Sequence, residues 1–181
     1  MQKIILGIAG EIASGKGTAA KYLIDRYGAS THRFSTSLRD VAKRMYLDES
    51  RENLQKISTM MRENFSDDIL SMVIYRDVAN DDNQVVAIDG VRRLADIEFL
   101  KKILEFKLVY INTSMENRYE RITKRGENVD DNAKTFEEFK KDHEREAELQ
   151  IKDLKDMADY VIDNNGTLEQ LYAQLDEIIQ K

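Results

Sequence analysis

A glycine-rich stretch near the amino terminus carries the residue types that bind phosphate groups. It reads Gly10-Glu11-Ile12-Ala13-Ser14-Gly15-Lys16-Gly17-Thr18. Glycines adopt backbone conformations that other residues avoid, and this brings N–H groups close to phosphate oxygens. Lys16 can neutralise the β- and γ-phosphates of a nucleoside triphosphate, and Thr18 offers a hydroxyl to phosphate or magnesium. The spacing is that of a P-loop. We therefore expect ATP to contact Gly10, Ile12, Ala13, Ser14, Gly15, Lys16, Gly17 and Thr18, with Lys16 catalytic.

The segments on either side of this loop are those that a P-loop requires. Residues Ile4 to Ala9 are apolar and predict a buried strand, and Ala19, Ala20, Leu23 and Ile24 follow at helical spacing. A helix that begins at the loop directs its positive end at the bound anion. The sequence thus predicts a strand, a phosphate loop and a helix in that order.

A second apolar run ends in a carboxylate. Gln84-Val85-Val86-Ala87-Ile88-Asp89 has the form of a Walker B strand, whose terminal acid holds magnesium directly or through water. We expect Mg²⁺ to be held by Asp89 and Thr18, and we count Asp89 among the catalytic residues. The alternative is an ordinary acid at a strand end.

The loop resembles those of two groups of small-molecule kinases. Its Gly-Lys-Gly-Thr ending is similar to adenylate kinases and related nucleoside monophosphate kinases. The stretch Ile12 to Lys16 looks like the Ile-Gly-Ser-Gly-Lys loop of dephospho-coenzyme A kinases. In both comparisons Ala13 stands where the family has glycine. The resemblance implies an ATP-dependent kinase with magnesium as its cofactor.

Two further segments resemble the acceptor side of adenylate kinases. Asp89-Gly90-Val91-Arg92 is similar to their Asp-Gly-aromatic-Pro-Arg signature, shortened by one residue, and implies that Arg92 binds the acceptor phosphate, with Arg93 as the alternative. Phe34 to Arg39 resembles their nucleoside monophosphate segment and that of phage-type deoxynucleotide kinases. This implies acceptor contacts from Ser35 and Arg39. Arg62 is a further acceptor candidate, or equally a surface residue.

Paired arginines follow the fourth predicted strand. Arg121 and Arg125 are four residues apart on a predicted helix and so share one face. Nucleoside monophosphate kinases carry similar arginines on the helix at the lid hinge, which implies that both residues neutralise the transferring phosphoryl group. Surface ion pairs with Glu116, Glu120 or Glu127 are the alternative.

The last predicted strand and its turn complete the donor site. Residues Ala158 to Leu168 resemble the corresponding segment of dephospho-coenzyme A kinases and archaeal adenylate-kinase-like proteins, where the turn borders adenine. The resemblance implies ATP contacts from Asn165, Gly166 and Thr167. Thr167 also fits the N-cap of a closing helix marked by Leu168, Leu171, Leu175 and Ile178.

Strands alternating with helices predict an α/β fold. The expected strands are Ile4–Ala9, Thr31–Ser35, Val85–Asp89, Lys107–Asn112 and Tyr160–Asp163, and their crossovers imply a five-stranded parallel sheet between helical layers, the three-layer α/β/α P-loop NTPase fold. Ile97, Leu100, Lys101 and Leu104 continue the helical pattern. We expect one domain over 1–181, with a helical acceptor-binding insert at 36–80. The charged segment 126–156 is either a short helical lid or a solvated helix.

Composition narrows the function further. A net charge of −6 over 181 residues argues against general nucleic-acid binding, and no apolar run is long enough to span a membrane. The chain has no Cys, which excludes thiolate chemistry, and its two His lack metal-ligand spacing. We expect a cytoplasmic protein whose partner is a small phosphorylated molecule. The oligomeric state is not readable.

The expected reaction is transfer of the γ-phosphoryl group of ATP to that molecule. A nucleoside or deoxynucleoside monophosphate is favoured because its ionised phosphate oxygen needs no general base. Dephospho-coenzyme A would need its hydroxyl activated, and Ser35, Thr36 and Ser37 stand where an acid would be expected. A second alternative is an adenylate-kinase-like ATPase that acts as a nucleotide-dependent binding or assembly factor.

Overall fold

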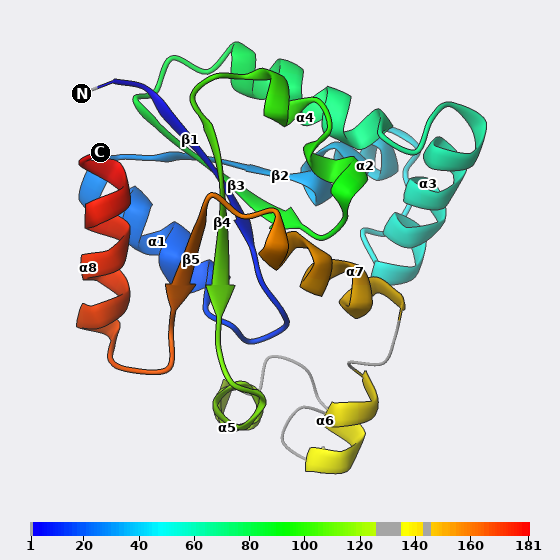
Figure 1. The fold of residues 1–181 in the computed structure, drawn as a ribbon. Coiled ribbons are helices and arrows are strands. Elements are labelled where there is room, and N and C mark those ends of the chain that lie inside the picture. The colour runs from blue at the N-terminus through cyan, green and yellow to red at the C-terminus, as the bar shows by residue number, and fades with distance from the viewer. Residues whose placement is uncertain (1, 126–134, 143–145) are drawn as a thin grey trace.

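A parallel sheet forms the centre of the molecule in the computed structural model, which describes residues 2–125, 135–142 and 146–181 (Figure 1). Five strands pair in the order β2-β3-β1-β4-β5, and every pairing is parallel. Their bounds are β1 Ile4–Ala9, β2 Ser30–Arg33, β3 Val85–Val91, β4 Phe106–Asn112 and β5 Tyr160–Asp163. The predicted five-stranded parallel sheet is confirmed.

Helices cover both faces of the sheet and give three layers. Those of the first half of the chain are α1 Lys16–Tyr27, α2 Phe34–Arg44, α3 Arg51–Asn64 and α4 Ile69–Ala79. Two short 3₁₀ turns follow β3, η1 Leu94–Ile97 and η2 Leu100–Lys102. After β4 come α5 Met115–Arg125, α6 Phe136–Asp142, α7 Glu146–Asp156 and α8 Leu168–Ile179. The predicted α/β/α P-loop fold is thereby confirmed.

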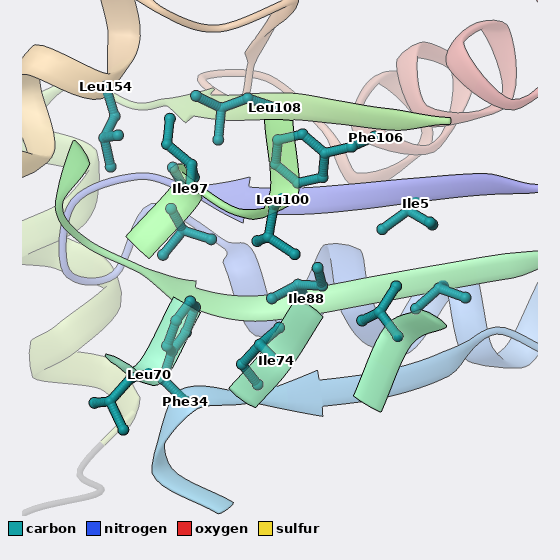
Figure 2. Packing of buried hydrophobic residues seen from close by; sticks show 14 of the residues in the cluster. Ile5, Phe34, Leu70, Ile74, Ile88, Ile97, Leu100, Phe106, Leu108 and Leu154 are labelled. Carbon is teal, nitrogen blue, oxygen red and sulfur yellow. The ribbon is translucent and has the colours of Figure 1, made fainter. Parts of the chain in front are cut away.

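The larger core lies between the sheet and α2, α4, α7 and the two 3₁₀ turns. Figure 2 shows Ile88 of β3 facing Ile74 of α4, with Leu100 and Ile97 filling the space towards β4. These four side chains are at most 2% exposed. Because apolar burial stabilises by roughly 25 cal/mol per Å², this layer fixes the position of every segment that leaves β3.

The opposite face of the sheet packs on α1 and α8. Leu6 and Ile8 of β1 meet Leu23 of α1 and Leu171 of α8, and all four are buried. The two helices are also joined by hydrogen bonds from the hydroxyls of Tyr22 and Tyr27 to Asp176, at 2.8 and 2.7 Å. The helix that begins at the phosphate loop is therefore anchored along its length.

Two expected elements differ from the structure. The second strand ends at Arg33 rather than Ser35, because Phe34 and Ser35 already form the first turn of α2. The segment containing Ile97 and Leu100 forms two 3₁₀ turns instead of a helix. Ile97 ends the first turn and Leu100 begins the second, and both side chains are buried in the larger core. Leu104, expected on the same helix face, is 90% exposed.

Parts of both predicted inserts belong to the core of the domain and do not form separate insertions. In 36–80, α4 packs on the sheet through Leu70 and Ile74, whereas α3 contacts mainly α2. In 126–156, α7 also belongs to the core, since Ile151 and Leu154 are buried there. Residues 126–134 and 143–145 lie outside the described residues. The part of the predicted lid that lies away from the sheet is thus α6, which contacts α5 (Figure 1).

Candidate active site

The phosphate loop joins the end of β1 to the start of α1. Gly10 and Gly15 have φ of 146° and 104°, values that side chains disfavour. Ala13 also has a positive φ, of 60°, at the position where the resembling kinase loops have glycine. The backbone therefore takes a glycine-like path even though this chain carries alanine there.

Lys16 and Thr18 begin the helix that leaves the loop. Nζ of Lys16 donates to the carbonyl oxygens of Gly10 and Glu11 at 2.7 and 2.9 Å, so the ammonium group lies over the loop. Thr18 is exposed, and a Cβ added at Gly17 would meet no atom within 4 Å. The first turn of α1 is therefore accessible at Gly17 and Thr18.

Residues far along the chain brace the back of the loop. The carbonyl oxygen of Ser14 accepts hydrogen bonds from Nδ2 of Asn164 at 2.7 Å and from Oγ1 of Thr113 at 3.0 Å. A Cβ at Gly15 would lie 2.3 Å from the same Asn164 nitrogen. Within the described residues, the buried Oγ of Ser14 has no hydrogen-bond partner. Glycine is therefore required at position 15 by contact as well as by φ.

Arg118 of α5 supports the phosphate loop through an ion pair and hydrogen bonds. It was not identified from the sequence as a site residue. Its side chain is 2% exposed, and Nη2 lies 3.1 Å from Oε1 of Glu11. Nε donates to the Thr113 carbonyl at 3.2 Å and Nη1 to the Ile12 carbonyl at 3.4 Å. The ring of Phe139 in α6 lies 5.8 Å from this guanidinium. The signal was present, because Arg118 precedes Arg121 by three residues and so shares its helix face.

Arg121 of α5 lies beside the phosphate loop and the turn after β5. Nη2 donates to the carbonyl oxygen of Asn164 at 2.8 Å, and Nη1 would lie 3.9 Å from a Cβ at Gly15. Glu120, one of its alternative partners, pairs instead with Lys124 at 2.5 Å. Arg125 ends α5, and its side chain lies outside the described residues. Of the two predicted arginines, only Arg121 therefore has a side chain that the structure describes.

A pocket of about 370 Å³ connects the loop to the turn after β5. It is lined by Gly15, Thr18, Arg121, Asn164, Gly166, Thr167 and Leu168. Thr167 also caps α8, where Gln170 returns the hydrogen bond to its N–H at 2.9 Å. Asn165 differs from its neighbours, since its Oδ1 accepts from the Ser114 N–H at 2.8 Å and thus supports the start of α5.

The turn after β3 begins beside the phosphate loop. In the ladder between β1 and β3, Ile8 pairs with Asp89 and Ala9 with Val91, and the irregularity between them is taken up by Gly90 at φ 88°. Ala9 and Val91 are the last pair of this ladder, and Gly10 and Arg92 are the residues that follow them. The side chain of Arg92 is exposed, and no ion pair involving it occurs in the described part of the chain.

Of the other predicted acceptor residues, Arg39 and Arg62 form ion pairs with acids. Arg39 pairs with Glu49 at 2.8 Å on the surface of the insert, and Ser35 is half-buried in the first turn of α2. Arg62, the further acceptor candidate, has a side chain that is 10% exposed, and its guanidinium lies 3.2 Å from the carboxylate of Asp96.

Asp89 and Thr18 carry oxygen atoms of the kind that Mg²⁺ binds. The Asp89 carboxylate is 23% exposed and lies 3.4 Å from Nε of Arg33, and the Thr18 hydroxyl is accessible. Mg²⁺ binds through one or two carboxylates together with substrate phosphates and water. Among residues 2–125, 135–142 and 146–181, no cluster of three or more His, Asp or Glu forms a self-contained metal site. Asp89 and Thr18 suit Mg²⁺ that arrives with a nucleotide.

Comparisons with known proteins agree with this geometry. Residues 7–140 match the AAA domain family. A UPF0200 protein of Saccharolobus islandicus is 31% identical over 183 residues, which cover 99% of this chain and 93% of that protein. In the described part of the chain, no helix is long and apolar enough to cross a membrane.

Solved structures share the fold at lower identity. TT1252 from Thermus thermophilus is 17% identical with a TM-score of 0.63, covering 99% of this chain and 98% of that one. Shikimate kinase from Bacteroides thetaiotaomicron is 13% identical with a TM-score of 0.61, covering 98% and 97%. The P-loop kinase-like fold is thereby shown, and the chain belongs to the UPF0200 family of AAA-domain proteins.

Proposed function

We propose that this chain transfers the γ-phosphoryl group of ATP to the phosphate of a nucleoside or deoxynucleoside monophosphate. The observation that supports the proposal is the pairing of Ala9 with Val91, since Gly10 of the phosphate loop and Arg92 are the residues that follow this last pair of the ladder. Arg92 has no acidic partner among the residues that the structure describes, and it suits a second phosphate group because guanidinium binds phosphate through two parallel hydrogen bonds.

The donor side would use the loop, Lys16 and Arg121. The loop amides and Lys16 bind the β- and γ-phosphates, while Arg121, held at Gly15 by the Asn164 carbonyl, neutralises the charge that moves during transfer. Thr18 and Asp89 would hold magnesium, which shields the phosphates from one another. The pocket lined by Gly166 and Thr167 is open beside the loop and would take the nucleoside of ATP.

The acceptor side would lie between Arg92 and the helical insert at 36–80. Arg92 binds the acceptor phosphate, and Ser35 at the start of α2 supplies a hydroxyl nearby. Arg39 would join them only after leaving Glu49, an exposed pair of the kind that is worth about 0–1 kcal/mol. We also propose that α6 and the segments around it close over the transferring group, and that these parts act as one domain.

The acids near the loop favour a phosphate acceptor over an alcohol. Asp89 pairs with Arg33, and Asp96 with Arg62, so each of these carboxylates already has a cation beside it. A hydroxyl acceptor such as dephospho-coenzyme A needs a base to remove its proton. A monophosphate oxygen is ionised at neutral pH and attacks without one. This difference supports the nucleotide acceptor.

The reaction is a direct in-line transfer. The acceptor oxygen forms a bond to the γ-phosphorus while the bond from that phosphorus to the β–γ bridging oxygen breaks. The products are ADP and a nucleoside diphosphate, and no proton or further reactant is required. Lys16 and Arg121 stabilise the charge that passes to the bridging oxygen.

The test measures ADP formation from Mg²⁺ and ATP with a panel of acceptors. The panel contains ribo- and deoxynucleoside monophosphates, dephospho-coenzyme A, and shikimate because a shikimate kinase shares the fold. The proposal expects ADP release that depends on one class of monophosphate. Turnover with dephospho-coenzyme A alone would favour that kinase instead. Slow release that no acceptor changes would favour an ATPase with a binding or assembly role.

Matched arginine variants sharpen this assay. Arg92→Ala should raise the KM for the acceptor by about tenfold or more while the KM for ATP stays near its original value, since the lost contact is specific to one substrate. Arg26→Ala, at the exposed end of α1 away from the loop, is the control and should change neither constant. Equal loss of both substrates in Arg92→Ala would argue against its acceptor role.

A further inference from the structure

An ion pair between the largely buried Arg62 and the buried Asp96 joins the helical insert to the turn that carries Arg92. Arg62, on α3, lies 3.2 Å from Asp96, in η1, and their side chains are 10% and 4% exposed. Charged groups are seldom buried to this degree unless they are paired and hydrogen-bonded. The pair therefore fixes the distance between α3 and the first 3₁₀ turn after β3.

The Asp96 carboxylate uses its two oxygens for different partners. Oδ2 accepts hydrogen bonds from the backbone N–H groups of Arg92 and Arg93, at 3.0 and 3.1 Å. Oδ1 faces the guanidinium of Arg62. One carboxylate thus holds the peptide backbone on which the Arg92 side chain is mounted, and the same group is held from the insert.

Arg62 has further contacts that keep it in place. It donates to the backbone oxygen of Asp67, and Nε lies 3.4 Å from Oγ of Ser58. The carboxylate of Asp67 lies 3.6 Å from Arg62 and 3.7 Å from Nη1 of Arg93. The turn and the end of α3 are therefore joined at two acids, one buried and one exposed.

A second tie fixes the other side of the same turn. The N–H of Phe99 donates to Oγ of Ser71 on α4 at 3.3 Å, and Ser71 is 1% exposed. Because α4 packs on the sheet, this contact holds η1 and η2 to the rigid core. Arg62 is then the link that adds α3, the outer helix of the insert, to the same unit.

We propose that Arg62 is a positioning residue that acts through Asp96 to hold Arg92 for the acceptor phosphate. The claim that Arg92 binds an acceptor phosphate rests on the proposed function. The contacts that run from Arg62 through Asp96 to the Arg92 and Arg93 amides, which we call the joint, do not. Without Arg62, Oδ1 of the buried Asp96 carboxylate loses its guanidinium partner, so the carboxylate turns towards water. That movement weakens its hold on the Arg92 and Arg93 amides. Moving α3 away from the sheet would separate Arg62 from Asp96 and would loosen the turn after β3 in the same way.

The first experiment measures the joint without reference to activity. Amide hydrogen exchange at Arg92 and Arg93 is compared by NMR in the native chain, Arg62→Leu and Arg62→Lys. We expect exchange about tenfold faster in Arg62→Leu, and intermediate in Arg62→Lys, which keeps the charge but loses the planar fork. Lys56→Met, which breaks an exposed ion pair with Glu52 on the same helix, is the control and should leave both amides unchanged.

The second experiment asks whether this joint serves phosphate binding. With the donor site filled by Mg²⁺ and ADP, inorganic phosphate is titrated and the Arg92 resonances are followed. We expect a dissociation constant for phosphate about fivefold higher in Arg62→Leu than in the native chain, the equivalent of roughly one hydrogen bond. The affinity for ADP should stay within about twofold, because Arg62 does not contact the loop.

Asp96→Asn provides a second route if Arg62→Leu does not fold. Its amide keeps an oxygen for the two N–H groups but loses the charge that pairs with Arg62, so amide exchange at Arg92 and Arg93 should be faster, and phosphate affinity lower, than in the native chain. Native exchange in every variant would overturn the joint. Faster exchange with unchanged phosphate affinity would reduce Arg62 to a purely structural role and overturn the positioning role.

The two proposals fail in different ways. If phosphate never shifts the Arg92 resonances of the native chain, the positioning role is overturned, even where amide exchange shows that Arg62 holds the turn through Asp96. The acceptor-dependent release of ADP would still decide the kinase function independently. If that release is absent while phosphate binding at Arg92 depends on Arg62, the positioning role stands and the kinase function falls.

Discussion

Nδ2 of Asn164 donates a hydrogen bond of 2.7 Å to the carbonyl oxygen of Ser14, although the two residues are 150 positions apart in the chain. The carbonyl oxygen of Asn164 in turn accepts from Arg121 at 2.8 Å. One asparagine therefore joins the phosphate loop, the arginine of α5 and the turn that lines the pocket. The shape of the loop depends on contacts that form only when β5 has been added beside β4.

This relationship makes Gly15 and Gly17 respond differently to the same substitution. Gly15→Ala would place a methyl group 2.3 Å from Asn164 Nδ2 at a φ of 104°, so we expect a loss of about 2–4 kcal/mol in unfolding free energy. Gly17→Ala meets open space on the first turn of α1 and should be neutral or stabilising by up to about 1 kcal/mol. Urea unfolding of both variants measures the contrast, and equal losses would contradict it.

Ala13 should tolerate glycine better than an ordinary alanine does. At φ 60° a side chain costs about 1 kcal/mol, which glycine relieves, and this offsets the greater entropy of glycine in the unfolded chain. We expect Ala13→Gly to leave the unfolding free energy unchanged or slightly higher. Ala173→Gly, on the exposed face of α8, is the matched control and should lose about 1 kcal/mol. Thermal unfolding of the pair shows whether position 13 is strained.

Arg118 should matter to both stability and ATP binding. Arg118→Met leaves Glu11 without its buried partner and two carbonyl groups without a donor, so we expect a loss of about 3–5 kcal/mol. Glu11→Gln keeps a polar group opposite the guanidinium and should cost less. The dissociation constant for Mg²⁺ and ATP, measured by calorimetry, should rise in both. An unchanged constant would show that Arg118 does not shape the loop.

Acid should weaken the edge of the sheet at Asp81. Burial alone would raise the pKa of Asp81, but hydrogen bonds from Ser30, His32 and Asn83 outweigh it and hold the pKa well below the usual 3.8. A carboxyl whose pKa is lower in the folded than in the unfolded chain stabilises above the unfolded value, and this stability is lost as pH falls below it. Asp81→Asn should therefore be less stable than the native chain at pH 7, by a margin that shrinks below about pH 4. Urea unfolding at both pH values tests this, and a constant margin would refute it.

The order and type of the main elements were predictable because each strand is a short apolar run bounded by polar residues. β1 and β5 match their expected bounds, and the loop between β1 and α1 lies where its glycines indicated. Phe34 was assigned to a strand because an apolar residue after β2 fits either a strand end or a buried helix start. Only packing against the core distinguishes the two, and Phe34 is buried as the first residue of α2.

The site was less predictable because its supports are long-range pairs. Arg62 was identified as a candidate, but its partner Asp96 is 34 residues away and leaves no trace in local spacing. The contacts of Arg118 with Glu11 and of Asn164 with Ser14 span more than half the chain. Spacing within a motif identifies the groups that face a ligand, whereas the groups that hold them depend on which strands become neighbours.

The fate of the γ-phosphate tests the central claim most directly. ATP labelled at the γ-phosphorus is incubated with Mg²⁺ and the acceptor that stimulates ADP release, and the labelled products are separated. We expect the label in a nucleoside diphosphate, with transfer abolished in Lys16→Ala and restored at high acceptor concentration in Arg92→Ala. Label found only in inorganic phosphate, whatever the acceptor, would contradict the phosphotransferase proposal.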